Sequence, residues 1–395
     1  MVEIKLKKGK DKAVNQRHPW VFSGALDKVK GKPENGDVVR LLDANNYFLA
    51  YGYYNDQSRV AVRLIEWNEE ITIDEAWYEQ KIKTAIAGRA HLLADKETTT
   101  SRLIFSEADF LPGLIVDRYA DFLSLQILSS GIEKAKDVII AVLVKLLQPK
   151  GIFDRSDATA RTHEGITAEN GLLWGEAPAE FIEVKENGIK YHINIAEGQK
   201  SGFYCDQRDN RKILASYTKG KSVLDCFSYS GGFSLNAFAQ GAAEVTSVDS
   251  SALAIETLKQ NIDLNKFDAS KHVAIQSDVN KQLRQFNDEG KKFDVVVLDP
   301  PKYAPSRSAL DRAARAYKDL NRRGLLLLES GGLLATFSCS GAVDIDTFKQ
   351  IIAWAALDAG KEVQVIYQFC QPEDHPVRLS FPEGEYLKGL LVRVV

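Results

Sequence analysis

The segment from Val223 to Leu235, which reads VLDCFSYSGGFSL, constrains the fold of this chain more than any other stretch. An apolar strand runs into an acidic residue, then into two glycines, and then into an amphipathic helix. Asp225 falls at the end of the strand, and Gly231 and Gly232 allow the backbone to approach a ligand where side chains would collide. The order predicts a strand, turn and helix that cradle a nucleotide-like cofactor. A purely structural strand, turn and helix is the alternative.

A second acidic residue strengthens the cofactor interpretation. Val245 to Asp249, VTSVD, is a short apolar strand that ends in an acid about 20 residues after the turn, where an acceptor for ribose hydroxyls is expected. Nicotinamide enzymes share this spacing but usually carry GxGxxG. Here the turn reads DxFxxxGG, with Phe227 inside it and no third glycine to cradle a pyrophosphate. The pattern resembles motif I of class I S-adenosylmethionine (SAM)-dependent methyltransferases, whose cofactor has no phosphate.

Length and composition set further bounds. The 395 residues, 45% hydrophobic and 27% charged, predict two or three packed domains. No apolar run is long enough to span a membrane, and the first residues lack the apolar core of a signal peptide. The four cysteines lie far apart, without CxxC spacing or clustered histidines. We therefore expect a cytoplasmic protein with reduced thiols, no membrane association and no metal site.

Patterning predicts an α/β chain in three parts: residues 1–72, 73–190 and 191–395. The first reads as short strands of a small basic β-barrel, and the second alternates strands with helices. The third repeats βα steps and closes with two strands that lack a helix between them. This is typical of a doubly wound, seven-stranded methyltransferase sheet rather than a dehydrogenase sheet. Its parallel strands are predicted at 222–226, 245–249, 273–277, 294–299 and 333–338.

Two basic segments stand out against a net charge of −3. Lys5 to Lys32 holds nine Lys or Arg against two acids, and Arg307 to Arg323, which includes Arg312 and Arg315, holds six against two. Both suit contacts with RNA phosphates. The first part of the chain also carries aromatic residues that either stack on RNA bases or fill its core: Trp20, Phe22, Tyr51, Tyr53 and Tyr54.

Acidic residues end four successive predicted strands. Ligands of open α/β sheets bind beyond the carboxyl ends of the strands, so these positions are the candidate site. We expect Asp225 to meet the amino-acid part of the cofactor, Asp249 its ribose and Asp278 its adenine amino group. For Asp278 a helix cap is an equal alternative. Asp299 ends the fourth strand.

Asp299 begins a motif that points to the substrate. Asp299-Pro300-Pro301 resembles the nucleobase-facing motif IV of methyltransferases, in which prolines stiffen a turn that faces the target base. Enzymes that methylate exocyclic amines usually place an aromatic residue after the second proline, whereas this chain has Lys302. The motif therefore argues against an amine target.

Cys339 follows the fifth strand and is the candidate nucleophile. Carbon 5 of a pyrimidine cannot attack a methyl sulfonium unaided, but a thiolate that adds to carbon 6 makes carbon 5 nucleophilic. Asp299 is expected to hydrogen-bond the ring near nitrogen 3. A buried structural cysteine is the alternative, and we assign that role to Cys205, Cys226 and Cys370. An ordinary thiol is mostly protonated at neutral pH, so Cys339 needs a nearby positive charge or base.

The segment GQKSGFYCDQRDNR precedes the first strand of the third part. Lys200, Tyr204, Gln207 and Arg208 are candidates to close over the cofactor. A helix that simply begins at Asp206 accounts for the segment equally well.

Taken together, the chain resembles bacterial 23S ribosomal RNA cytosine-5 methyltransferases with an N-terminal PUA domain. The matching strings run nearly its full length: KGKDK, RHPWVFSGA, LPGLIVDRYADFL, FDRSD, GFYCDQRDNR, CFSYSGGF, DPPK, TFSCSG, DHPV and EGEYLKG. The resemblance implies a PUA domain, a central strand-strand-helix-strand-strand domain, a class I methyltransferase domain, SAM as cofactor and 23S rRNA as partner. It also implies that Cys339 is the motif VI nucleophile. Lys302 stands where a related branch carries a second cysteine for product release, which leaves the release base unassigned.

Two other functions stay open from the sequence. One is a methyltransferase for a nucleobase amine, for which Cys339 would be dispensable. The other is an RNA-binding or ribosome assembly factor that binds the cofactor without turnover. A homodimer is also left open, because the sequence does not define the oligomeric state.

Overall fold

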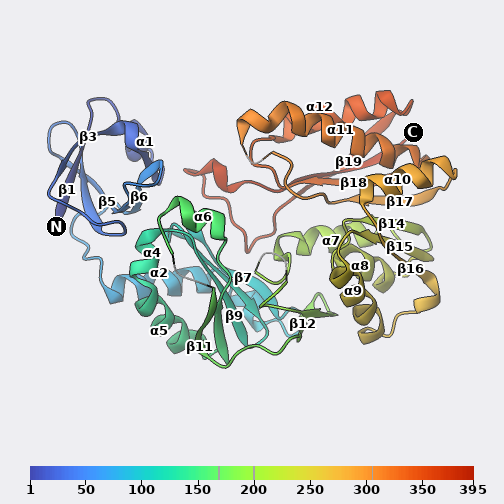
Figure 1. Ribbon diagram of the computed structural model, residues 1–395, viewed down its shortest axis with the longest axis horizontal. Coiled ribbons are helices and arrows are strands. Elements are labelled where there is room, and N and C mark those ends of the chain that lie inside the picture. The colour runs from blue at the N-terminus through green and yellow to red at the C-terminus, as the bar shows by residue number, and fades with distance from the viewer. Residues whose placement is uncertain (168–169, 199–200, 305) are drawn as a thin grey trace. The chain divides into compact units, whose positions relative to one another are not determined.

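The structure is a computed structural model that describes residues 1–395 except 168–169, 199–200 and 305. It divides into two compact units (Figure 1). Unit 1 comprises Met1–Val184, Ile193–Cys205 and Glu373–Gly384, and unit 2 comprises Lys185–His192, Asp206–Pro372 and Glu385–Val395. The domain boundaries at 72 and 190 stay predictions, and both of the first two predicted parts lie largely in unit 1.

Unit 1 begins with a six-stranded sheet in the order β2-β6-β5-β4-β1-β3. Side chains such as Ile4, Leu41 and Leu64 have no exposed surface and form its core. The hairpin between β4 and β5 turns at Asn46, whose φ of 71° is left-handed, as short polar side chains tolerate. The elements are β1 (Val2–Leu6), α1 (Lys12–Asn15), β2 (Trp20–Phe22), η1 (Ser23–Ala25), β3 (Leu26–Lys30), β4 (Val38–Leu42), β5 (Phe48–Tyr54) and β6 (Val60–Glu66).

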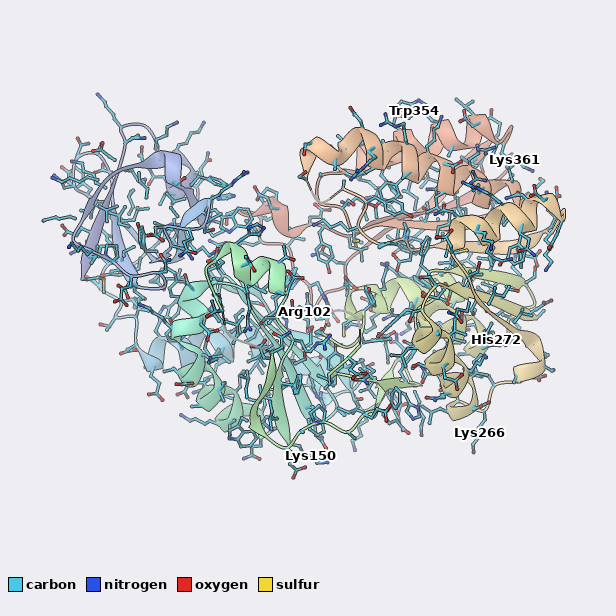
Figure 2. All side chains as sticks on the ribbon, in the orientation of Figure 1. Arg102, Lys150, Lys266, His272, Trp354 and Lys361 are labelled. Carbon is cyan, nitrogen blue, oxygen red and sulfur yellow. The ribbon has the colours of Figure 1, made fainter. Side chains whose placement is uncertain are left out.

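The second sheet of unit 1 has five strands in the order β11-β10-β9-β8-β7. Arg102 on β7 and Asp117 on β8 are buried and face each other in register, joined by hydrogen bonds of 2.8 and 2.9 Å (Figure 2 labels Arg102). The elements are α2 (Glu75–Ala87), α3 (Ala90–Ala94), β7 (Thr100–Phe105), η2 (Ser106–Asp109), β8 (Leu114–Tyr119), β9 (Phe122–Ile127), α4 (Ser130–Lys134), α5 (Lys136–Leu147), β10 (Gly151–Asp154), α6 (Ala158–His163) and β11 (Gly171–Gly175).

A hairpin of β12 (Ile182–Glu186) and β13 (Ile189–Ile193) follows, and the division between the units runs through it. Its turn is Asn187-Gly188, with φ values of 52° and 82°. Two successive left-handed residues match the twist of a two-residue hairpin, which is why this dipeptide predicts the turn.

Unit 2 is built on a seven-stranded sheet in the order β16-β15-β14-β17-β18-β20-β19. The first five strands are parallel, and β20 runs antiparallel to both of its neighbours. Helices α7, α8 and α9 cover one face, and α10, α11 and α12 cover the other (Figure 1). The predicted fold class is confirmed. The strands are β14 (Ser222–Cys226), β15 (Glu244–Asp249), β16 (His272–Gln276), β17 (Phe293–Leu298), β18 (Leu328–Ser338), β19 (Val363–Cys370) and β20 (Lys388–Val394).

The helices of unit 2 connect these strands. They are η3 (Cys205–Gln207), α7 (Arg208–Ala215), α8 (Gly232–Ala239), α9 (Ala252–Leu264), η4 (Ala269–Lys271), α10 (Val279–Asp288), η5 (Arg307–Ala309), α11 (Leu310–Leu326) and α12 (Ile345–Asp358), while η6 (Pro382–Gly384) belongs to unit 1. The predicted strand boundaries agree to within a residue except in β18, which begins five residues earlier than expected. Its first residues, LESGG, are largely polar or glycine and therefore hide the apolar strand pattern.

Within the described residues, none of the helices combines the length and apolar character needed to cross a bilayer. The same part of the chain contains no group of three or more His, Cys, Asp or Glu side chains arranged to hold a metal ion.

Candidate functional site

The candidate site lies where the strand order of unit 2 reverses. β14 pairs with β15 on one side and with β17 on the other, and the chain reaches β17 only after completing β15 and β16. At such a switch point the loops on either side diverge and leave a crevice beyond the carboxyl ends of the strands. The residues that end β14, β15, β17 and β18 therefore define the site.

The loop after β14 has a strained backbone. Phe227 and Tyr229 have φ values of 61° and 47°, and Gly231 has 92°. A left-handed conformation costs a bulky residue about 1–2 kcal/mol, so the surrounding contacts must hold it. A Cβ atom on Gly231 would lie 2.9 Å from Leu258, and one on Gly232 would lie 2.9 Å from Arg211. Gly231 is therefore needed for the turn and for packing, whereas Gly232 begins α8 and leaves room for the Arg211 side chain.

Asp249, at the end of β15, holds this loop. Its Oδ2 accepts a hydrogen bond from the Tyr229 backbone N–H at 2.9 Å, and its Oδ1 accepts one from Ser251 at 2.9 Å. Each carboxylate oxygen can accept a second hydrogen bond. Asp249 thus combines a structural role in the loop with acceptor capacity toward a ligand.

Asp225 is almost completely buried, and only one of its oxygens is used. Oδ2 accepts from the N–H and the hydroxyl of Ser234 at 3.0 and 2.6 Å, which ties β14 to the first turn of α8. Oδ1 is buried without a hydrogen-bond partner among the described residues. Burial raises the pKa of Asp225 to about 7, although Ser234 lowers it, and the charges of Asp299 and Asp249 raise it further. Negative charge is therefore concentrated at the ends of β14, β15 and β17.

A chain of hydroxyls leads from Asp225 to the edge of the sheet. The Ser234 hydroxyl lies 2.7 Å from that of Ser247 on β15, which lies 2.9 Å from Nε2 of His272 on β16 (Figure 2 labels His272). Burial, with a contribution from Lys259, lowers the pKa of His272 to about 4. The imidazole is therefore neutral near pH 7 and places no positive charge on the carboxylate cluster.

Asp299, after β17, is held by Gln207. The Gln207 amide donates to Asp299 Oδ2 at 3.0 Å and accepts from Asn210 at 2.7 Å. Gln207 is buried at the end of η3, just before α7. The structure thus places Gln207 against the nucleobase-facing acid, a contact between residues 92 positions apart that the sequence did not reveal.

Asp278 caps a helix. Its Oδ1 accepts from the Lys281 backbone N–H at 2.9 Å at the start of α10. Its charge also contributes, after burial and Tyr317, to raising the pKa of Tyr303 to about 12. The cap that the sequence left as an alternative is present, and contact with adenine stays a prediction.

The loops after β17 and β18 are fastened to each other. The backbone N–H of Ala304 donates to the Ser340 hydroxyl at 3.1 Å, and the Ser338 hydroxyl donates to Tyr317 at 2.9 Å. Tyr317 and Ser340 are themselves 3.1 Å apart, oxygen to oxygen. A buried network of hydroxyls therefore fixes the segment on both sides of Cys339.

Asp299 and Cys339 leave neighbouring strands. Leu298 on β17 is paired with Thr336 on β18, so Asp299 follows this pair by one residue and Cys339 by three. Within Asp299-Pro300-Pro301-Lys302, Pro300 is buried, whereas Pro301 and Lys302 are exposed. The two candidate reacting groups therefore share one end of the sheet.

Lys388 stands beside Cys339 and was missed by the sequence analysis. Its ammonium is buried and donates to the backbone oxygens of Ser340 and Val343 at 2.9 and 2.6 Å. Among the described residues no carboxylate forms an ion pair with it. Burial lowers the pKa of Lys388, and the interaction with Cys339 is the largest opposing influence. The sequence did offer one indication of its importance, because Lys388 lies in EGEYLKG, one of the strings that carry the family resemblance, at the start of β20.

The other cysteines differ from Cys339. Cys205 and Cys226 are buried, and the Cys205 sulfur lies 3.2 Å from the Thr100 hydroxyl. Cys370 is exposed, and Cys339 is partly exposed. Cys226 and Cys205 thus have structural surroundings, whereas Cys370 has a more open environment than we expected.

The basic segment at 307–323 lies largely on α11 and separates into two kinds of residue. Lys318 pairs with Asp358 at 2.7 Å, and Arg322 pairs with Asp319 at 3.7 Å. Arg312 and Arg315 are exposed and form no ion pair in the described part of the chain. Among the described side chains of the segment, Arg312 and Arg315 are thus available for a polyanion.

Of the remaining candidates, Lys200 lies outside the described residues, and Arg208 pairs with its neighbour Asp209 at 3.0 Å. The aromatic residues of the first part mostly fill the core. Tyr51 and Tyr53 are buried, and the Trp20 indole N–H donates to Glu107 at 2.8 Å. Phe22 is the exposed member of the group.

Two protein-family models match the chain. A PUA-like domain matches residues 4–67, and an S-adenosylmethionine-dependent methyltransferase model matches residues 165–364. Proteins named ribosomal RNA large subunit methyltransferase I from Shewanella frigidimarina and Aliivibrio fischeri are each 45% identical to it. They align over all of this chain and over 99% and 100% of their own lengths. The chain belongs to the ribosomal RNA large subunit methyltransferase I family.

Solved structures agree on the fold of this family member. A methyltransferase complexed with S-adenosylhomocysteine (SAH) superposes with a TM-score of 0.87 at 22% identity, and both chains are covered completely. A SAM-dependent methyltransferase from Streptococcus mutans gives 0.86 at 22% identity, again over both whole chains.

The residues of the site fit SAM, the cofactor of the family. SAM carries an ammonium and a sulfonium, and Asp225 has a buried carboxylate oxygen that no described residue hydrogen-bonds, near the charges of Asp249 and Asp299. A cation in this place would stabilise the ionised carboxylate of Asp225, whose pKa is raised by burial and, to a smaller extent, by Asp299 and Asp249. When bound, SAM supplies an electrophilic methyl group. Asp225, Asp249 and the Phe227 to Gly232 loop are the residues that would hold it.

Proposed function

We propose that the protein transfers the methyl group of SAM to carbon 5 of a cytosine in 23S rRNA through a covalent adduct with Cys339. The family supports a large-subunit rRNA substrate, since its members carry that activity in their names. The observation that carries the choice of carbon 5 is the buried ammonium of Lys388, which donates to the backbone oxygen of the residue after the partly exposed Cys339 and forms no ion pair among the described residues.

The chemistry assigns a task to each group. The Cys339 thiolate adds to carbon 6 of the cytosine, and the electron pair of the carbon 5–carbon 6 bond makes carbon 5 nucleophilic. Carbon 5 then attacks the methyl group, and SAH leaves. Loss of the carbon 5 proton to a base expels the thiolate and restores the ring. Asp299 holds the ring near nitrogen 3 throughout.

The surrounding residues prepare these groups. Gln207 orients the Asp299 carboxylate through its 3.0 Å hydrogen bond. Lys388 favours the thiolate of Cys339, because a positive charge in a poorly solvated place lowers the pKa of a neighbouring thiol. The rigid hydroxyl network around Ser340 keeps the nucleophile in position. These are positioning roles, because each group acts through Asp299 or Cys339.

The other predicted contacts complete the proposal. Asp225, Phe227, Gly231, Gly232, Asp249 and Asp278 bind SAM. Pro300, Pro301 and Lys302 border the base, and Arg312 and Arg315 bind RNA phosphates. An unstacked cytosine in an rRNA loop is the favoured target, because flipping a base from a duplex costs a few kcal/mol. We propose that the activity is cytoplasmic. We also propose that the protein forms a homodimer, which analytical ultracentrifugation at micromolar protein concentration would test.

Mapping of 5-methylcytosine in large-subunit RNA, in cells with and without the gene, tests the function. We expect one 5-methylcytosine to disappear with the gene and to return with the wild-type protein or with Cys370→Ala, but not with Cys339→Ala. A lost mark on an exocyclic nitrogen would show an amine methyltransferase. Unchanged methylation together with defective ribosome assembly would show a factor without turnover.

A further inference from the structure

Unit 1 contains a hollow that the methyl-transfer reaction does not use. It has a volume of about 510 Å³, within the range of about 300–1,000 Å³ that is typical of ligand pockets. The C-terminal segment Glu373–Gly384 contributes to its wall together with residues from the first 110 positions. We call it the Arg378 pocket, after one of the residues that line it. Its lining includes Arg17, Glu66, Trp67, Lys81, Phe110 and Arg378.

Arg378 is a partly buried cation whose hydrogen bonds, among the described residues, go to uncharged oxygens, and the Glu107 carboxylate acts on it only through longer-range attraction. Its guanidinium donates to the Ser380 hydroxyl at 2.8 Å and to the backbone oxygens of Glu107 and Arg17 at 3.3 and 2.7 Å. In the part of the chain that the structure describes, it forms no ion pair. Burial lowers the pKa of Arg378 to about 10, so the group keeps its charge at neutral pH. A bound anion would compensate for this burial.

Phe110 presents an aromatic ring on a strained backbone. Its φ is 62°, in the left-handed region that bulky residues avoid, and 39% of its surface is exposed. Its ring lies 4.1 Å from the Arg378 guanidinium carbon and 5.4 Å from the Lys81 nitrogen, measured to the ring centroid. The left-handed backbone is that of a helix C-cap, since Phe110 ends η2. The cap leaves the ring partly exposed and in contact with two cations, Lys81 and Arg378.

The charges and rings of the pocket are complementary to a nucleotide. Arg17, Lys81 and Arg378 outnumber the single acid, Glu66, which Lys81 and the Trp77 indole N–H already bind at 3.1 and 3.2 Å. The surplus positive charge suits a phosphate. Aromatic faces next to arginine suit a flat base, as in single-stranded RNA recognition. An acidic peptide would use the charges but not the rings.

We propose that the Arg378 pocket binds one unstacked nucleotide of a single-stranded RNA segment, with its phosphate on Arg378 and Arg17 and its base against Phe110. The inference rests on the proposed rRNA substrate and extends it to a second contact point. The pocket would anchor the RNA strand through unit 1 independently of the chemistry in unit 2.

Fluorescence anisotropy with the full-length protein and a labelled single-stranded RNA octamer tests the proposal. We expect Phe110→Leu to weaken binding about tenfold, since it removes a stacking face but keeps an apolar side chain. Arg17→Gln should reduce the slope of log affinity against log salt by about 0.7, as one phosphate contact is lost from a single strand. The matched control is Tyr47→Leu, an aromatic residue of the same unit that is 72% exposed and lies outside the pocket.

A photocrosslink locates the bound RNA, and a competitor distinguishes an RNA ligand from an acidic peptide. With 5-bromouridine in the octamer, the crosslinked peptide should contain Phe110 or Trp67. Wild-type affinity in a folded Phe110→Leu protein, or a crosslink confined to other peptides, would overturn the proposal. So would a glutamate heptamer that displaces the RNA and binds Phe110→Leu as well as wild type. If the pocket does not bind RNA, the protein should still form 5-methylcytosine. If the protein does not form 5-methylcytosine, the pocket should still bind the octamer.

Discussion

The two halves of the crevice in unit 2 are held together by different chemistry. On the β14 and β15 side, the carboxylates of Asp225 and Asp249 bind backbone N–H groups and fix a strained loop. On the β17 and β18 side, hydroxyls and the ammonium of Lys388 fix the loops around Cys339. Negative charge therefore gathers where a cationic cofactor is expected, and positive charge stands beside the thiol.

The difference shows how one crevice can both bind a cationic cofactor and stabilise an anionic thiolate. Burial, with a smaller contribution from Asp299 and Asp249, raises the pKa of Asp225, and burial lowers the pKa of Lys388. In each case the charged form of the side chain is destabilised in the protein without a bound partner, and a partner of opposite charge would stabilise it. A sulfonium cofactor is that partner on one side and a thiolate is that partner on the other. Variants that act on one half should leave the other half unchanged.

Replacing Asp249 by Ala should produce the largest change in the cofactor half. The variant loses a charge-assisted hydrogen bond to the ribose, about 1.5–3 kcal/mol, so SAM affinity should fall about 10- to 100-fold. Isothermal titration calorimetry with SAM and SAH measures this. Asp268→Ala, an exposed acid at the start of η4, is the matched control. Equal affinity in a folded Asp249→Ala protein would remove Asp249 from the site.

The pH dependence of cofactor binding tests Asp225. Its pKa of about 7 is raised, so the folded protein without cofactor binds this proton more tightly than the unfolded chain, and its contribution to stability is lost as the pH rises through 7. Binding of the cationic cofactor requires the ionised form. SAM affinity should therefore rise roughly tenfold between pH 6.0 and pH 7.5. Asp225→Asn should flatten this profile, and an unchanged profile would contradict the assignment.

Replacing Lys388 by Met should change the reactivity of Cys339 on the β17 and β18 side and leave SAM binding unchanged. Without the ammonium the thiol pKa of Cys339 rises, and alkylation at pH 7 should slow about fivefold. The rate is followed by mass spectrometry of the Cys339 peptide across pH, and Lys388→Arg should restore much of it. Lys361→Met is the control, because Lys361 also donates to a backbone oxygen, that of Leu328, at 3.0 Å. Identical alkylation profiles in wild type and Lys388→Met would refute the role.

The smallest expected effect concerns the two available arginines of α11. The double substitution Arg312→Gln and Arg315→Gln should weaken RNA binding a few fold and flatten its salt slope by about 1.4 for a single-stranded segment. Filter binding across a range of salt concentrations measures the slope. Arg322→Gln serves as control, because Arg322 already pairs with Asp319. Slopes that agree with wild type would exclude this surface from RNA binding.

The sequence predicts those features of the fold that depend on neighbouring residues alone. The parallel strands, the acids that end them and the turn at Asn187-Gly188 follow from periodicity and turn chemistry. Contacts that depend on strand order do not follow. Gln207 meets Asp299 across 92 residues, and Lys388 reaches the loop of Cys339 across 48, because β20 inserts beside β18.

The Arg378 pocket was hidden for the same reason. The hydrogen bond from Arg378 to the backbone of Arg17 joins residues 361 positions apart. The aromatic residues singled out near the N-terminus mostly fill the core, since Tyr51 and Tyr53 are buried. Phe110 carried no local signal of exposure, because a left-handed phenylalanine is not a recognisable pattern. The sequence thus located the crevice but not the groups that tune it.

Covalent trapping on RNA that contains 5-fluorocytosine tests the central claim most directly. Fluorine at carbon 5 cannot leave as a proton, so wild-type protein with SAM should form a protein–RNA adduct that survives denaturation. Cys339→Ala should form none and should lose turnover by at least about 10³-fold while keeping its SAM affinity. An adduct that persists in Cys339→Ala, or methylation by that variant at a wild-type rate, would contradict the account.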